Sequence, residues 1–262
     1  MTEAEQRRSG HGSRESRRGQ GRPKRDRSPL RGGVVVVVVV ASVALVAAAG
    51  LSVASLAFRR TERRTHVLRG TVSRVAVAGD SGDVRLRSAT VPDVEVRETR
   101  RFWLGEPKLR LSLRAGMLVA AVRCPRFAPR CADDLEITVP ARVREATVDV
   151  DSGDVEVSGF DARTVTAHSD SGDISGERLR SATVAGTSDS GDVRLALDAT
   201  PRTVKARTDS GDVEVTVPTG RYRIEAKTDS GDVDLDRVVR DDGAANRIDA
   251  SSDSGDVAVR GG

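Results

Sequence analysis

Apolar and polar residues alternate along most of the chain after residue 75, and the alternation is organised around a repeated tetrapeptide, Asp-Ser-Gly-Asp. Val or Ile follows each copy, and the copies begin at Asp80, Asp151, Asp170, Asp189, Asp209, Asp229 and Asp253. Apolar or small residues dominate the positions six and four before each serine and three and five after it, with mostly Thr and charged residues between. This period of two predicts half-buried β-strands on both sides of a tight Ser-Gly corner.

The spacing of the copies predicts a stacked repeat, because the intervals are 71, 19, 19, 20, 20 and 24 residues. One interpretation is a parallel β-solenoid with coils of about 20 residues. The alternative is a stack of β-hairpins, in which Ser-Gly is the two-residue loop. The recurrence of one corner, and of small residues four positions before the serine, favours the solenoid and a narrow interior. The glycines expected at the corners are Gly82, Gly153, Gly172, Gly191, Gly211, Gly231 and Gly255.

The long interval between Asp80 and Asp151 has room for three or four degenerate coils. Short strands are predicted at Val91–Val96, Leu109–Leu113, Met117–Val122 and Leu135–Val139. Arg97–Trp103 is predicted to be a covering loop or cap that blunts the sheet edge at the start of the stack. No comparable cap follows the last coil, which ends at Arg260.

The N-terminal part of the chain predicts a membrane protein. Residues 1–32 hold ten Lys/Arg and four Asp/Glu with few apolar residues, which indicates a disordered basic tail. Residues 33–58 carry no charge, include seven consecutive valines, and are long enough for a transmembrane helix. Residues 59–74 are expected to be a basic spacer, and residues 75–262 the β-repeat domain.

The predicted topology is single-pass in the plasma membrane, with a cytoplasmic N-terminus and an extracytoplasmic C-terminal domain. The alternative is a cleaved signal peptide, for which Ala47–Ala49 offers a small-residue site. The positive net charge of +4 resides in the tail, because residues 59–262 carry 33 basic and 35 acidic side chains. We therefore expect no nucleic-acid partner.

The segment Val148–Val155, its tandem copies and the strand end Ile137–Pro140 resemble the bacterial putative adhesin family. The resemblance covers about Val75 to Val259. It implies an all-β, solenoid-like domain behind a membrane anchor and no established catalytic residues.

The repeated aspartates are the main candidate chemistry, because stacked coils would align them in two columns of like charge. The preferred interpretation is that they are turn residues that accept backbone N–H bonds. The alternative is calcium bridging the columns, with no other cofactor expected. The calcium candidates are Asp151, Asp154, Asp170, Asp173, Asp189, Asp192, Asp209, Asp212, Asp229 and Asp232.

Catalysis is not indicated by the sequence. Asp-Ser-Gly occurs in aspartic proteases, but those need two converging sites rather than seven repeated ones. A polysaccharide-acting enzyme is a second alternative, although aromatic residues make up only 2% of the chain. His168 has no partnered nucleophile and is expected to be a surface residue of a strand.

Cys124 and Cys131 are predicted to form a disulfide if the domain lies outside the cytoplasm; inside, they would be reduced buried thiols. The expected function is a non-enzymatic adhesion, scaffold or envelope-binding module. Its expected partners are the lipid bilayer through residues 33–58 and a cell-wall polymer or another envelope protein. The alternative is a regulatory component that senses the envelope.

Overall fold

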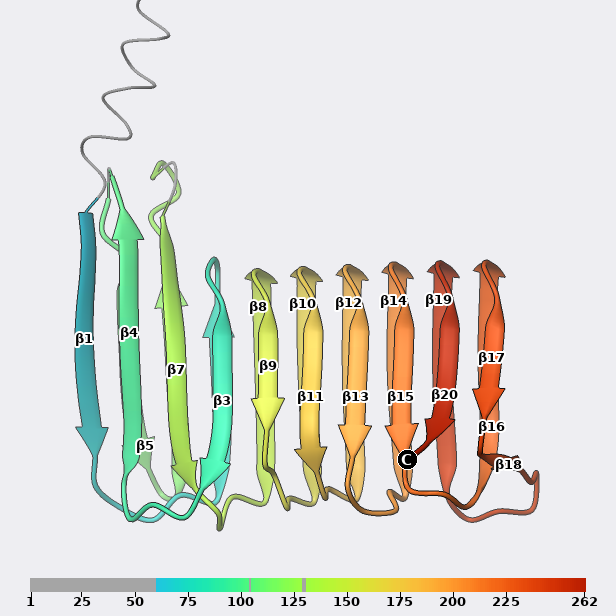
Figure 1. Cartoon of the computed structure of the whole chain (residues 1–262). Coiled ribbons are helices and arrows are strands. Elements are labelled where there is room, and N and C mark those ends of the chain that lie inside the picture. Colours follow the sequence, from blue (N-terminus) through green and yellow to red (C-terminus); the bar gives the residue numbers. More distant parts are fainter. Residues whose placement is uncertain (1–59, 104, 129–130) are drawn as a thin grey trace, which may run out of the picture. The chain divides into compact units, whose positions relative to one another are not determined.

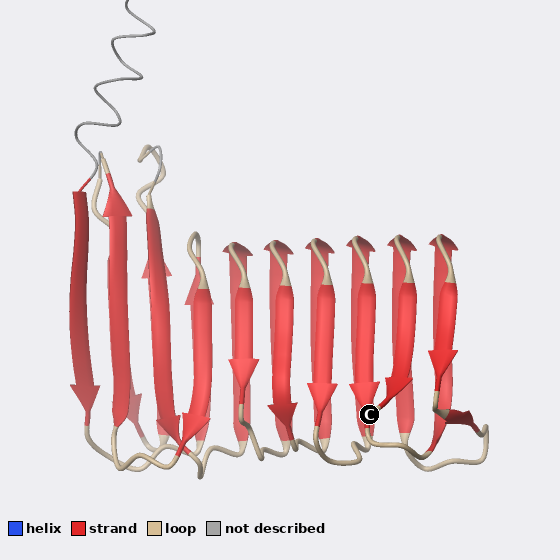
Figure 2. Cartoon of the chain, in the orientation of Figure 1, coloured by secondary structure: helices blue, strands red, loops and turns tan. Residues whose placement is uncertain are grey.

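The computed structural model describes residues 60–103, 105–128 and 131–262, which belong to one compact unit of the chain, Ala54–Gly262. The predicted tail and the predicted transmembrane segment lie outside the described residues. In the part that is described, no helix has the length and apolar character needed to cross a membrane. Every regular element there is a β-strand (Figure 2).

The described residues form twenty strands in two ten-stranded sheets. The strands are β1 (Arg60–Leu68), β2 (Arg74–Gly79), β3 (Val84–Ala89), β4 (Val94–Phe102), β5 (Lys108–Arg114), β6 (Met117–Arg123), β7 (Ala132–Pro140), β8 (Glu145–Ser152), β9 (Val155–Ser158), β10 (Thr164–Ser171), β11 (Ile174–Leu179), β12 (Thr183–Ser190), β13 (Val193–Leu197), β14 (Thr203–Ser210), β15 (Val213–Val217), β16 (Arg221–Ser230), β17 (Val233–Asp236), β18 (Val239–Arg240), β19 (Arg247–Ser254) and β20 (Val257–Gly261). The predicted all-β fold is confirmed.

Each regular coil gives one strand to each sheet, and the Ser-Gly corner carries the chain from one sheet to the other (Figure 1). Sheet A has the order β1-β4-β7-β3-β9-β11-β13-β15-β20-β17, and sheet B has the order β18-β16-β19-β14-β12-β10-β8-β2-β6-β5. Neighbouring coils pair in parallel and in register, as where Val165 of β10 lies opposite Val184 of β12. The hairpin alternative is therefore wrong, because the two strands at a corner belong to different sheets.

The last coil in sequence is not the last coil in space. Strands β19 and β20 lie between the coil β14/β15 and the coil β16/β17. The interval between Asp229 and Asp253 is 24 residues, longer than the 19 or 20 residues between the other regular corners. The additional residues lie in the connection after β17, which leads the chain back across the coil β16/β17 to the position of β19. The strand that ends at Gly261 therefore needs no cap, since β15 and β17 pair with it on both sides.

The beginning of the stack departs from the regular coil. Strand β4 pairs antiparallel with β1 and β7, and β5 pairs antiparallel with β6. The prediction of a covering loop at Arg97–Trp103 is wrong, because residues up to Phe102 belong to β4. Residues 60–68, expected to be spacer, form β1, so the folded domain begins before residue 75. The other three predicted strands of this region lie within β5, β6 and β7.

The hydrophobic core fills the space between the two sheets and is continuous from Val72 to Val259. It is built from the inward positions of the strands, which bury Val, Ile, Leu and Ala side chains and exclude water from them. The interior is narrow at the position four residues before the corner serine. At Gly186, for example, an added Cβ would lie only 3.0 Å from Cγ1 of Val193.

Candidate functional site

The Ser-Gly corners stack directly on one another along one edge of the domain. The Gly191 N–H donates to the Ser210 carbonyl at 2.9 Å, and the Gly211 N–H donates to the Ser254 carbonyl at the same distance. Gly211 has a φ of +144°, and an added Cβ would lie 2.4 Å from the Gly191 carbonyl oxygen. All seven predicted corner glycines have a positive φ and such a close backbone neighbour. The corner therefore requires glycine for its backbone shape and for the close approach of the next coil.

The second aspartate of each tetrapeptide is part of a hydrogen-bond ladder. Its Oδ1 accepts the backbone N–H of the equivalent aspartate in the next coil, as from Asp212 N–H to Asp192 at 2.8 Å. The same bond recurs at 2.8–3.2 Å through Asp134, Asp83, Asp154, Asp173, Asp192, Asp212, Asp256 and Asp232. This arrangement supports the interpretation of these residues as turn aspartates.

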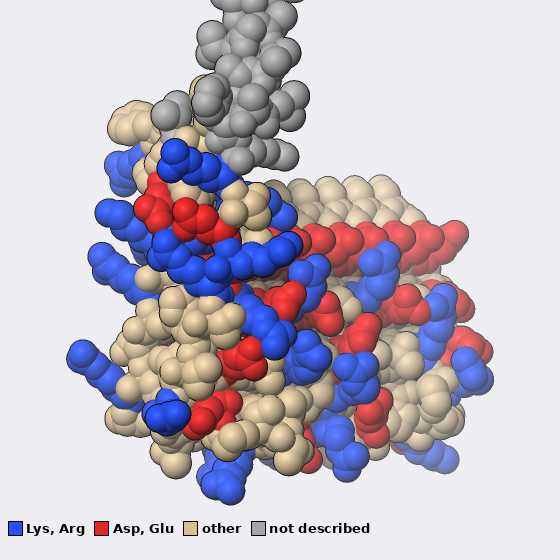
Figure 3. All heavy atoms as spheres, turned by 60° about the vertical axis from the view of Figure 1, so that its left-hand side comes forward, with Lys and Arg blue, Asp and Glu red and all other residues tan. Residues whose placement is uncertain are grey.

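The first aspartate of each tetrapeptide lies on the sheet B side of the corner and is mostly exposed to solvent. Burial, together with the neighbouring Asp80 and Asp170, raises the pKa of Asp151. Acidic side chains form a continuous row beside the corner ridge (Figure 3). Among the described residues, no group of three or more His, Cys, Asp or Glu side chains is placed to hold a metal ion. Calcium binding by the ten candidate aspartates stays the untested alternative.

A second ladder was not predicted from the sequence. Two residues before the corner serine, a buried or half-buried hydroxyl donates to the corner glycine carbonyl of a neighbouring coil, as from Ser188 to Gly172 at 2.9 Å. The donors are Ser169, Ser188, Thr208, Thr228 and Ser252. The sequence contains a signal for this ladder, because five of the seven copies carry Ser or Thr two residues before the corner serine.

The two aspartates of one corner should respond differently to truncation. Asp212→Ala removes the acceptor of the Asp256 N–H and should lower the Tm of residues 54–262 by about 2–4 °C. Asp209→Ala in the same corner removes an exposed carboxylate and should leave the Tm unchanged or slightly raised. Thermal unfolding followed by circular dichroism measures both. Equal losses in the two variants would contradict the assignment of the ladder.

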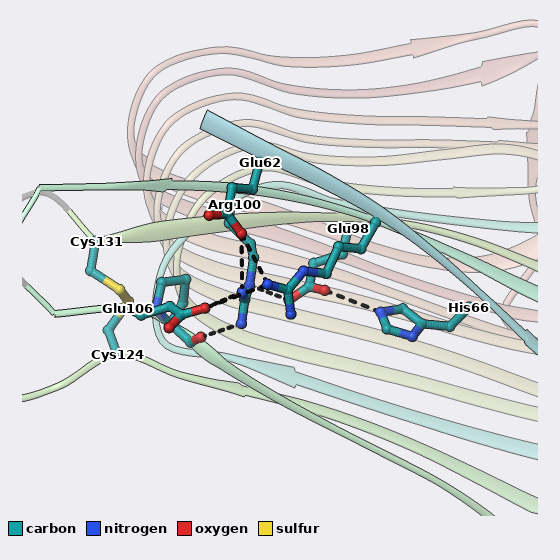
Figure 4. Close-up of polar contacts among 9 residues, drawn as sticks. Glu62, His66, Glu98, Arg100, Glu106, Cys124 and Cys131 are labelled. Carbon is teal, nitrogen blue, oxygen red and sulfur yellow. Dashed lines mark hydrogen bonds and ion pairs between the residues drawn. A yellow bond between two sulfur atoms is a disulfide. The ribbon is translucent and has the colours of Figure 1, made fainter. Parts of the chain in front are cut away.

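A buried cluster of charged side chains lies at the beginning of the stack, where β4 pairs with β7 in sheet A (Figure 4). Glu98, Arg100 and Asp133 are 2%, 6% and 2% exposed. Arg100 Nε lies 2.8 Å from Glu98 Oε1, and Arg100 Nη2 donates to the Pro107 carbonyl at 2.9 Å. Arg100 Nη1 also forms an ion pair with Glu106. Because Arg100 reaches several carboxylates, it compensates part of the cost of burying them.

Asp133 is the least satisfied member of the cluster. Both of its carboxylate oxygens are buried without a hydrogen-bond partner among the described residues. Burial, followed by the adjacent Glu98, raises the pKa of Asp133 to about 8. Asp133 therefore holds a proton at neutral pH. Strand β1 joins the cluster through His66, whose Nε2 lies 3.1 Å from Glu98 Oε2.

This cluster was missed in the sequence. Glu98 and Arg100 occupy inward positions of β4, in the same alternation as Val94, Val96 and Phe102. Asp133 stands where the regular corner has glycine, because Leu135 of β7 is in register with Val84 after the Gly82 corner. The sequence indicates this departure, because Cys131–Asp134 replaces the Asp-Ser-Gly-Asp tetrapeptide in the coil of β7.

The predicted disulfide between Cys124 and Cys131 is present, with the two Cα atoms 5.9 Å apart. It closes the connection between β6 and β7. The Cys124 N–H donates to Oδ2 of Asp80 at 3.0 Å, so the disulfide lies beside the first regular corner. The extracytoplasmic location inferred from this pair stays a prediction.

His168 lies on the outward face of β10, as expected. Its Nδ1 lies 3.0 Å from the Thr187 carbonyl oxygen, and its Nε2 lies 3.1 Å from Asp170 Oδ1. Neither partner is a Ser, Thr or Cys side chain that a histidine base could activate as a nucleophile. The surface also has shallow hollows, one of about 440 Å³ lined by Ser73, Arg74, Arg144, Glu145, Arg163 and Thr164.

The repeated coils and their corners have counterparts in known proteins. Residues 61–260 match the family described as Toastrack DUF4097. The chain belongs to this Toastrack family. The resemblance to bacterial putative adhesins is confirmed at the level of the family. A comparison with curated proteins found no match.

Solved structures similar to this Toastrack domain come from several bacteria. A putative cell adhesion protein from Clostridium sporogenes ATCC 15579 has a TM-score of 0.49 at 9% identity, covering 78% of this chain and 100% of that chain. A putative adhesin from Bacteroides fragilis NCTC 9343 has a TM-score of 0.42 at 12% identity, covering 77% and 97%. A putative lipid binding protein from Parabacteroides distasonis ATCC 8503 has a TM-score of 0.31 at 9% identity, covering 77% and 97%.

Proposed function

We propose that the Toastrack domain is a non-catalytic binding platform of the cell envelope, located outside the cytoplasm and anchored in the membrane by residues 33–58. The observation that carries this proposal is the in-register, parallel stacking of the coils. Stacking turns each outward position into a straight row of side chains at the strand spacing of about 4.8 Å. Since hydrogen bonds hold each inner strand on both sides, the rows keep their spacing and suit a polymer with repeating units.

The outer face of sheet B supplies a basic hollow for such a polymer. The hollow has a volume of about 200 Å³ and is lined in part by Lys205, Arg207, Lys227 and Arg247. Arg247 is neutralised by Glu225 at 3.1 Å and Asp249 at 2.8 Å. Lys205 and Lys227 have no ion-pair partner among the described residues, which leaves the hollow positive. We infer that the ligand is an anionic cell-wall polymer.

The buried cluster supports a non-catalytic role rather than a sugar-cleaving one. Glycoside hydrolysis needs two carboxyl groups that reach the substrate from either side of the scissile bond. Glu98 and Asp133 are each only 2% exposed and lie between strands, so a polymer on the surface does not contact them. Their arrangement is suited to holding β1, β4 and β7 together.

Co-sedimentation with purified, insoluble cell wall tests the proposal. Residues 54–262 contain the whole described core and are the unit to use. We expect the fragment to sediment with the wall, and Lys205→Glu to weaken binding about fivefold, the change that corresponds to roughly 1 kcal/mol. Arg87→Glu is the matched control, because Arg87 is exposed on β3 in the opposite sheet. Absence of binding, or equal loss in both variants, would contradict the proposal.

A further inference from the structure

The two ends of the stack differ. At the beginning, the additional strands β1, β4 and β5 extend the sheets beyond the first regular coil. At the other end, the outermost coil is β16/β17, with the short strand β18 beside it (Figure 1). The end coil is therefore built like an inner coil, but no further coil covers it among the described residues.

Core positions of the end coil are exposed. Val233 and Leu235 are 46% and 39% exposed, whereas Val257 and Val259, their partners in register on β20, are each 0% exposed. Val239 of β18 is 52% exposed beside them. Three of the five large apolar side chains that are exposed in the described part of the chain lie at this end. Such a concentration is typical of an interaction surface.

The backbone at this end also lacks partners within the described residues. Strand β17 pairs with β20 on one side, and its other side is an open edge of sheet A. Strand β16 pairs with β19, and β18 covers its other side only at Arg221 and Tyr222. Two strand edges therefore run side by side, one in each sheet, and each can accept another strand.

The two edges carry opposite charge. Asp234 and Asp236 are exposed on β17, although Asp236 is paired with Arg237 at 3.0 Å, while Arg223 and Lys227 point outward from β16. Glu225, between these two basic residues, is paired with Arg247 at 3.1 Å. Lys227 is three residues before Ser230 of the corner, and Asp234 is three residues after Gly231, so they lie at the same level of the coil.

We propose that this end of the stack is a homodimer interface, in which two copies meet end to end across a two-fold axis parallel to the strands. This axis places β17 of each copy antiparallel to β16 of the other and covers Val233 and Leu235. It also places Lys227 of one copy opposite Asp234 of the other. The two-fold symmetry makes this contact occur twice in the dimer.

The charges favour this arrangement over a second two-fold one. A two-fold axis perpendicular to the sheets would pair β17 with its own copy and place acidic side chains opposite acidic ones. A head-to-tail filament would bring the basic strands β16 and β5 together, but it would also place the acidic edge of β17 against β1, which carries Arg60, Arg63 and Arg64. Sedimentation therefore has to distinguish the filament from the dimer. The proposed dimer closes on itself, so no larger assembly follows from it.

Sedimentation equilibrium of residues 54–262 tests the interface. We expect a concentration-dependent monomer–dimer equilibrium without larger species. Lys227→Glu and Asp234→Lys should each raise the dimer dissociation constant about tenfold, and the double variant should restore it. Leu235→Lys should give a monomer that still folds, because the side chain is exposed in a single copy. Lys205→Glu, on the inner strand β14, is the control and should leave the dimer unchanged.

Three results would overturn the inference. They are a wild-type fragment that stays monomeric at about 1 mM, an open-ended polymer, and a dimer that Asp234→Lys and Leu235→Lys leave intact. Two variants separate this inference from wall binding: Asp234→Lys leaves the residues of the basic hollow in place, and Lys205→Glu leaves the end coil in place. Lys227→Glu changes both surfaces and is read only together with these two.

Discussion

Gly211→Val should lower the Tm of residues 54–262 by about 6–12 °C, the shift that corresponds to a loss of about 3 kcal/mol in a domain of this size. Two costs add at this position. The backbone φ of +144° is strained for any residue with a Cβ. The new Cβ would also meet the Gly191 carbonyl oxygen at 2.4 Å, and backbone of the neighbouring coil has no rotamer by which to move aside.

The control for this variant is Gly243→Val. Gly243 lies in the exposed connection between β18 and β19, and its φ is not positive. An added Cβ there would approach only Oδ1 of Asp241, at 3.3 Å, which is the end of a side chain that can move. We expect little change in Tm. If thermal unfolding shows the same loss for both glycines, the corner has no special requirement.

Asp133→Asn should raise the Tm at pH 8 and flatten the dependence of stability on pH. Burial raises the pKa of Asp133 from 3.8 to about 8 in the folded protein. Between these values the folded state holds a proton that the unfolded state has lost. The free energy of unfolding therefore falls as pH rises from about 4 to 8, by up to about 1.4 kcal/mol per pH unit for this group. Asparagine is neutral at every pH and offers Glu98 an N–H donor.

Urea unfolding at a series of pH values measures this effect. The wild-type protein should be more stable at pH 5 than at pH 8, and Asp133→Asn should lose most of that difference. Asp198→Asn, which alters an exposed carboxylate of the connection after β13, should retain the wild-type slope. A wild-type protein whose stability rises from pH 5 to pH 8 would contradict a buried protonated Asp133.

The regular coils could be predicted because each carries its own local information. Alternation of apolar residues predicts the strands, and the repeated corner shows that a single backbone solution recurs. The disulfide could be inferred because Cys124 and Cys131 are the only two cysteines of the chain. These features depend on residues close together in the sequence.

The parts that could not be predicted depend on which coils are neighbours. All coils have the same alternation, so no local pattern shows that β19/β20 lies between β14/β15 and β16/β17. The predicted strand Val91–Val96 includes the start of β4, but the rest of β4 was predicted to be a loop because Glu98 and Arg100 occupy inward positions, where polar residues usually indicate solvent. Their burial is compensated by side chains from β1 and β7 and by residues near β5, which only the tertiary structure brings together.

We propose that hydrogen bonds between coils hold the corners and that no metal ion is needed there. One oxygen of every second aspartate except Asp232, in the end coil, already accepts a backbone N–H, as between Asp192 and the Asp212 N–H at 2.8 Å. Thermal unfolding of residues 54–262 with a calcium chelator, and again with calcium restored, distinguishes these hydrogen bonds from calcium bridging. We expect the same Tm under both conditions. A large fall with chelator that calcium reverses would contradict the claim and make the aspartate columns a calcium-binding element.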